Sequence, residues 1–140
     1  MLIFVCLAVL ATGCSTFNRD WTNAAAVPPP TNDITGRWEG EWHSDANGHH
    51  GRLRCLITQL DGTHYRARYR ASWGKIFHFG YTVDMRVERS DNLFRFEGGA
   101  DLGRLAGGMY RYDGRADSTN FVSNYKSRRD HGTFQMARPR

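Results

Sequence analysis

Arginine recurs at every second position in two nearby stretches of the chain. The five residues are Arg52, Arg54, Arg66, Arg68 and Arg70. Alternate residues of a strand share one face, so two neighbouring strands would align these guanidinium groups as a ladder. Guanidinium groups match the geometry of carboxylate and phosphate groups. The ladder is therefore a candidate contact for an anionic partner.

Carboxylates occur in the stretches on either side of the ladder. Glu39 and Glu41 precede it, and Asp84 and Glu88 follow it. If the neighbouring strands carry these groups on the same outer face, they neutralise the arginines. Exposed ion pairs of that kind contribute little individually. We therefore favour an outward, solvated charge ladder and keep an anionic contact as the alternative.

Other reactive residue types lack the spacing that chemistry requires. His49 and His50 are adjacent, so in a strand they point to opposite faces and form no metal site. Asp130 and His131 have no serine in a strand-turn-helix nucleophile motif to act with. Cys55 alternates with apolar neighbours and is predicted to be an inert core thiol. We assign no catalytic residue, no metal and no cofactor, and we leave an enzyme as the third hypothesis below.

The composition and the hydrophobic pattern indicate one small β domain. The chain has 140 residues, 40% of them hydrophobic and 24% charged, with a net charge of +5, which is too low for a dedicated nucleic-acid binder. From Ile34 onward, period-2 alternation recurs between turn residues. We predict eight strands, near residues 35–43, 51–59, 63–72, 76–89, 93–98, 102–114, 119–126 and 132–138.

The second and third strands permit a prediction of register. A three-residue loop, Leu60–Gly62, with Gly62 in a left-handed bulge would pair Ile57 with Tyr65. One face of the hairpin is then wholly apolar. The other places Arg54 opposite Arg68, and like charges in that position are destabilising. We therefore expect an acidic group beside the ladder.

Eight antiparallel strands with short links favour an up-and-down barrel, because closure removes the sheet edges. A flattened sandwich is the alternative. A barrel of this size holds packed side chains or one small ligand. The inward set is rich in aromatic residues and includes Phe77, Phe121, Tyr125 and Phe134. Those predicted to bind a ligand are Trp38, Trp42, Tyr65, Tyr69, Phe79, Tyr81, Phe94, Phe96, Tyr110 and Tyr112.

The start of the first strand carries a short motif. Gly36-Arg37-Trp38 resembles the Gly-x-Trp sequence that opens the first strand of lipocalins and avidins. In those families the tryptophan plugs one end of the barrel, and in lipocalins an arginine near the C-terminus packs on it. The resemblance implies that Trp38 is such a plug and that Arg138 is the arginine.

The N-terminal segment reads as a membrane-targeting signal. Residues 1–13 are apolar and uncharged, which suits a signal peptide and is too short for a spanning helix. Leu10–Ser15 resembles the lipobox of bacterial lipoproteins, which implies lipidation at Cys14 and a bacterial cell-envelope location. Ser15 after the cysteine implies outer-membrane sorting in a Gram-negative host. An ordinary secretory peptide cleaved near Ala or Gly is the alternative.

Residues 14–33 contain Pro28-Pro29-Pro30 and many small polar residues. This composition predicts an extended tether between the membrane and a barrel domain at residues 34–140. Three hypotheses follow, in order of weight: a tethered module that binds a small apolar or aromatic ligand, an envelope structural or interaction protein with a filled core, and an enzyme. A cavity of several hundred Å³ would favour the first over the second.

Overall fold

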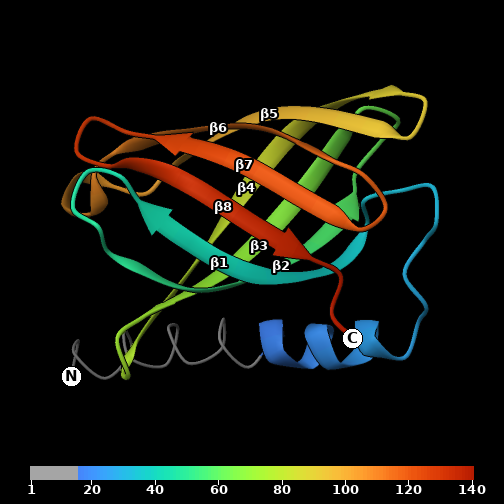
Figure 1. The fold of residues 1–140 in the computed structure, drawn as a ribbon, viewed down its shortest axis with the longest axis horizontal. Coiled ribbons are helices and arrows are strands. Elements are labelled where there is room, and N and C mark those ends of the chain that lie inside the picture. Colours follow the sequence, from blue (N-terminus) through green and yellow to red (C-terminus); the bar gives the residue numbers. More distant parts are fainter. Residues whose placement is uncertain (1–15) are drawn as a thin grey trace, which may run out of the picture.

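The computed structural model describes residues 16–140 and contains a closed barrel of eight antiparallel strands (Figure 1). Each strand pairs with its neighbours in chain order, and the first pairs with the last. The strands are β1 (Gly36–Ser44), β2 (His50–Gln59), β3 (His64–Trp73), β4 (Phe77–Ser90), β5 (Leu93–Asp101), β6 (Met109–Ala116), β7 (Asn120–Lys126) and β8 (His131–Ala137). The predicted barrel is confirmed, and the sandwich alternative is excluded.

The predicted boundaries hold to within a residue or two except around the fifth and sixth strands. β5 extends to Asp101, and β6 begins only at Met109. The residues between them form a loop with a short 3₁₀ helix, η1 (Arg104–Ala106). Gly103, Gly107 and Gly108 all have positive φ angles, which side-chain-bearing residues rarely adopt and a continuous strand excludes.

The predicted register of the β2–β3 hairpin is wrong by two residues. Ile57 pairs with Ala67, and the two strands are linked through Asp61, whose Oδ1 accepts the backbone N–H groups of Thr63 and His64. This side-chain capping lengthens the loop and leaves Gly62 without the left-handed conformation predicted for it. Because the register is shifted by two residues, an even number, every side chain stays on the face of the sheet that was predicted for it. The apolar face of the hairpin is therefore as predicted. The arginine pairing changes: Arg54 faces Arg70.

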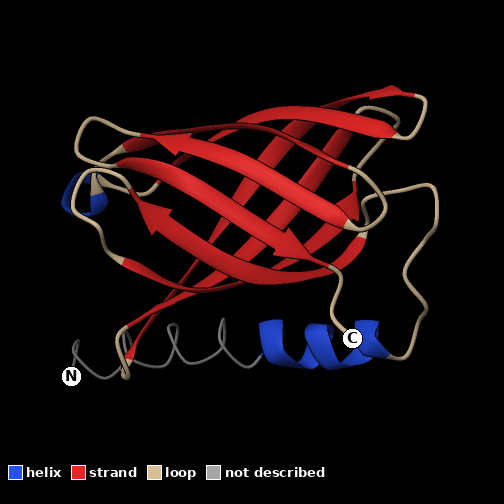
Figure 2. Ribbon diagram, viewed as in Figure 1, coloured by secondary structure: helices blue, strands red, loops and turns tan. Residues whose placement is uncertain are grey.

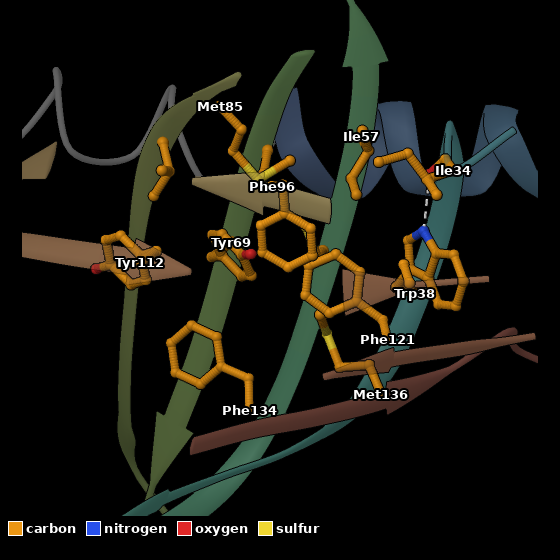
Figure 3. Close-up of a cluster of buried hydrophobic side chains, with 14 of the residues drawn as sticks. Ile34, Trp38, Ile57, Tyr69, Met85, Phe96, Tyr112, Phe121, Phe134 and Met136 are labelled. Carbon is orange, nitrogen blue, oxygen red and sulfur yellow. Dashed lines mark hydrogen bonds between the residues drawn. The ribbon is translucent and has the colours of Figure 1, made fainter. Parts of the chain in front are cut away.

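One end of the barrel is filled and closed by Trp38, which is fully buried (Figure 3). Its indole N–H donates to the Ile34 carbonyl at 2.9 Å, and its ring packs against Phe121. The Arg138 guanidinium lies 4.0 Å from the Trp38 ring centroid and donates to the Thr35 and Arg37 carbonyl oxygens. The arrangement expected from the Gly-x-Trp resemblance is therefore present.

A helix at residues 16–25 lies along the outside of the barrel (Figure 2). The predicted extended conformation is wrong for this part of the segment. Phe17, Trp21 and Ala24 have the spacing of one helical face, and Phe17 is buried although it lies outside the barrel. The predicted signal peptide and the predicted lipidated Cys14 lie outside the described residues.

Candidate functional site

The opposite end of the barrel is open and contains an aromatic pocket of about 380 Å³. It lies where β1, β3, β5 and β7 end and where β4, β6 and β8 begin. The residues that line it are Trp42, Ala71, Phe79, Gly80, Tyr81, Leu102, Tyr110, Tyr112, Tyr125, Asp130 and Phe134. The pocket is therefore built from most of the strands and from two of the loops at that end.

The barrel wall is incomplete beside this pocket. β4 pairs with β3 from Phe77 onward, but its pairing with β5 begins only at Asp84. The first half of β4 consequently has no strand partner on one side, and two pocket residues, Phe79 and Tyr81, lie in it. Phe79 is 47% exposed. The pocket thus borders both the end of the barrel and this unpaired edge.

The aromatic rings around the pocket form a connected network. Tyr81 and Tyr112 have centroids 6.1 Å apart with nearly parallel planes, and Phe134 lies 5.1 Å from Tyr125. The Trp42 indole N–H donates to the Ser72 carbonyl at 2.9 Å, which fixes that ring at the rim. Offset-stacked rings of this kind make a rigid apolar surface.

The pocket contains few polar side chains, and hydrogen bonds engage them within the protein. Asp130 accepts hydrogen bonds from Ser44 Oγ at 2.5 Å and from Tyr125 Oη at 3.3 Å. Burial raises the pKa of Tyr125, and the neighbouring Asp130 carboxylate raises it further. Burial also raises the pKa values of Tyr81 and Tyr112. These phenols therefore stay protonated, and the Tyr125 proton is donated to Asp130.

Half of the predicted ligand-binding residues line the pocket. Trp42, Phe79, Tyr81, Tyr110 and Tyr112 do so. The other five lie in the filled part of the core: Trp38, Tyr65, Tyr69, Phe94 and Phe96. They are buried in the core as predicted but do not line the pocket, and Tyr69 lies directly behind it, 5.1 Å from the Tyr81 ring.

Several lining residues were absent from the predicted site. Tyr125 and Phe134 belong to the predicted inward set, and their alternation in the last two strands was the available signal. Leu102 and Asp130 lie at or beside strand ends. No periodic pattern marks such loop positions as part of a pocket.

The arginine ladder lies on the outer face of β2 and β3, and the N-terminal helix covers part of it. Arg68 pairs with Asp20 at 2.7 Å, and this hydrogen bond lowers the pKa of the Asp20 carboxyl. The guanidinium groups of Arg54 and Arg68 lie 5.4 Å and 5.6 Å from the Phe17 ring centroid. The helix thus supplies the acidic group expected beside the ladder.

The predicted carboxylate neighbours account for other parts of the ladder. Arg66 makes a bidentate pair with Asp84, at 2.7 Å and 3.0 Å. Glu39 and Glu41 lie opposite Arg54 and Arg52 across β1 and β2. Glu88 was also expected here, but its nearest ion-pair partner is Arg86. The ladder is therefore largely occupied by groups of the chain itself.

The remaining reactive residues are distributed over the molecule. Cys55 is fully buried, and burial raises the pKa of its thiol. His49 packs against Trp73 with tilted rings, whereas His50 stacks on His43. Within residues 16–140 no three His, Cys, Asp or Glu side chains come together as metal ligands. No helix in that part of the chain is long and apolar enough to cross a membrane.

Comparisons with known proteins find similarity in the fold alone. No protein-family model matches the chain, and no curated protein matches it. Among solved structures, the chain is similar to a de novo designed fluorescence-activating β-barrel. The TM-score is 0.55 and the sequences are 16% identical, over 81% of this chain and all of the designed one. At that identity the likeness concerns the barrel shape and not the ligand.

Proposed function

We propose that this protein is a ligand-binding barrel, tethered to a bacterial envelope membrane, which holds a small apolar or aromatic molecule at its open end. The observation that carries the proposal is the aromatic pocket of about 380 Å³ beside a filled, closed half. Ligand pockets in proteins span about 300–1,000 Å³ and combine apolar walls with a few polar groups. Here the polar groups are tyrosine hydroxyls and Asp130.

The second candidate function is a structural or interaction protein with a filled core. It is favoured by the closed half, where Trp38, Phe121 and Ile57 are almost completely buried. The open half argues against it, because a purely structural barrel has no need of an aromatic cavity. The ligand-binding function is therefore the better supported of the two.

Fluorescence titration with the neutral dye N-phenyl-1-naphthylamine tests ligand binding. The dye should bind saturably with one site per chain. Phe79→Ala should weaken binding about fivefold or more, because an aromatic contact contributes about 1 kcal/mol beyond its area. Phe77→Ala is the matched control, since Phe77 lies two residues away on the same strand and is not part of the pocket. Absence of saturable binding, or equal effects of both variants, would refute the pocket's role.

Two features of the sequence support the membrane tether: the apolar N-terminal run and the lipobox-like residues around Cys14. In the sequence Cys14 lies two residues before Thr16, the first described residue of the docked helix, which limits the distance between their Cα atoms to about 7 Å. A lipid on Cys14 would therefore hold the barrel wall close to the bilayer and not at the end of a long extended segment. Exposed large apolar side chains also gather at the open end, where a membrane surface could cover them: Trp73, Ile76, Phe77, Phe79, Leu105 and Met109.

Mass spectrometry and membrane fractionation of the full chain expressed in a Gram-negative host test the tether. The native protein should carry a diacylglyceryl group on Cys14 and require detergent for extraction. Cys14→Ala should abolish the added mass, whereas Cys6→Ala in the apolar run should leave it unchanged. Mature masses of the native protein and Cys14→Ala that differ only by the sulfur atom of the substitution would exclude lipidation.

A further inference from the structure

A second hollow, of about 610 Å³, lies at the open end between two loops. One is the loop that contains η1, and the other joins β7 to β8. Its walls carry three arginines, Arg104, Arg128 and Arg129, together with Leu105 and two glycines. Arginines from two separate loops therefore line a common space.

The hollow adjoins the aromatic pocket. A Cβ atom added to Gly107, which lines the hollow, would lie 2.9 Å from Tyr110 Oη in the pocket. Arg129 also directly precedes Asp130, another pocket residue. A single ligand could therefore occupy the pocket with its apolar part and reach the arginines with its polar end.

The three arginines have no carboxylate partner within 4.0 Å among the described residues. The nearby acids are engaged elsewhere: Asp101 accepts the Gly103 N–H, and Asp130 is bound to Ser44 and Tyr125. Several unpaired guanidinium groups around one concave space produce a positive potential that favours an anion.

Hydrogen bonds within the two loops hold their backbones in place. Ser127 Oγ accepts the N–H groups of Arg129 and Asp130, and the Ser127 N–H donates to the Asp130 carbonyl. In the other loop, the Leu102 N–H donates to the Gly108 carbonyl at 2.9 Å. A fixed backbone limits the conformational entropy that binding would cost.

We propose that the ligand is an anionic amphiphile, with an apolar or aromatic body in the pocket and an anionic head group at Arg104, Arg128 and Arg129. This proposal rests on the proposed ligand-binding function and names the chemical class of the ligand. The head group can be a carboxylate, sulfonate or phosphate, because guanidinium pairs with each in the same way. It can belong to a free amphiphile or to a lipid.

Two dyes that share one aromatic frame separate the two proposals. 8-Anilinonaphthalene-1-sulfonate is the anionic counterpart of N-phenyl-1-naphthylamine. We expect the native protein to bind the anionic dye more tightly at low salt, with the difference shrinking as salt screens the charges. Failure of the neutral dye to bind refutes the proposed function. Binding of the neutral dye with no preference for the anionic one refutes only the anionic head-group site.

A triple variant assigns the preference to residues. Arg104→Gln combined with Arg128→Gln and Arg129→Gln should weaken binding of the anionic dye about tenfold or more, the usual scale for losing charged hydrogen bonds, and change neutral-dye binding less than twofold. The matched control is Arg86→Gln combined with Arg95→Gln and Arg115→Gln, because it removes the same number of charges from β4, β5 and β6, away from the hollow. Equal losses in both variants would indicate a general charge effect and overturn the proposal.

Competitors identify the source of the head group. Laurate should displace the neutral dye more effectively than dodecanol, which has the same chain and no charge, and equal displacement would overturn the proposal. Phosphatidylglycerol vesicles form a second arm, with phosphatidylcholine vesicles as the control. Displacement by laurate alone supports a free amphiphile, and displacement by phosphatidylglycerol that the triple variant resists supports a lipid head group.

Discussion

Replacing Trp38 with alanine should remove the plug at the closed end and destabilise the barrel strongly. The side chain is 0% exposed, packs on Phe121 with ring centroids 5.6 Å apart, and lies beneath the Arg138 guanidinium. Truncation of a packed tryptophan costs about 3–5 kcal/mol, from lost burial and from the cavity left behind. Small domains have about 5–15 kcal/mol of stability in total. Trp38→Ala should therefore lower Tm by about 15 °C or more.

Two further variants separate the contributions to that loss. Trp38→Phe keeps an apolar ring and removes the indole N–H that bonds to the Ile34 carbonyl at 2.9 Å. It should cost about 1–3 kcal/mol, the range for leaving a buried polar group unpaired. Trp73→Ala is the control, because Trp73 is 41% exposed, and it should cost less than about 1 kcal/mol.

Urea unfolding followed by far-ultraviolet circular dichroism is the suitable assay, since changes in tryptophan content alter fluorescence directly. The free energy of unfolding is taken from the midpoint and slope of each transition. A loss below about 1 kcal/mol for Trp38→Ala, no greater than that for Trp73→Ala, would refute the plug and the closed-end geometry built around it.

Three other predictions concern the helix, a loop and a strand. Arg68→Glu should release the helix at residues 16–25, because it replaces the 2.7 Å ion pair with Asp20 by a repulsion between two carboxylates. Amide hydrogen exchange in the helix should become faster in this variant and stay unchanged in the control variant Arg52→Glu. Unchanged protection of the helix in Arg68→Glu would contradict the docking. Hydrogen bonds from the Thr63 N–H and from His64 lower the pKa of Asp61 from its ordinary value of 3.8 to about 2. The ionised carboxylate therefore stabilises the fold fully above pH 3.8, and this stabilisation is lost as the pH falls through about 2. Asp61→Asn should therefore show a shallower fall of the urea midpoint between pH 4 and pH 2, and identical profiles would count against the prediction. Gly40→Ala should destabilise the barrel by about 1–3 kcal/mol or more, since the added Cβ would lie 1.9 Å from the Gln135 carbonyl oxygen. Gly62→Ala, with nothing within 4 Å, should leave Tm nearly unchanged, and similar melting of both variants would disprove the close strand contact.

The strands and their inward faces could be predicted from the sequence because alternation is a local property of extended backbone. The prediction of inward faces does not depend on the exact register. The pairing of β2 with β3 is shifted by two residues from the predicted one, yet Cys55 and Ile57 still face the core. The plug could also be predicted, since Gly36-Arg37-Trp38 resembled a known strand opening. Arg138, a hundred residues later, occupies the expected place on the Trp38 ring.

The composition of residues 14–33, which is rich in proline and small polar residues, does not predict the docked helix. Phe17 and Trp21 are isolated apolar residues among polar ones, and their burial depends on contact with Arg54 and Arg68. Helical spacing of Phe17, Trp21 and Ala24 was a usable signal for the helix. No local signal could identify the surface that the helix covers.

Three features of this chain follow from local sequence patterns: its strands, the side chains that point inward, and the arginines that align on the outside. Which inward aromatic residues fill the core, and which surround a pocket, depends on the packing of the whole barrel. The direction of a side chain follows from its own backbone, whereas an empty volume is what remains after side chains from all eight strands have packed. That volume depends on register, strand length and loops together, as the unpaired first half of β4 beside the pocket demonstrates.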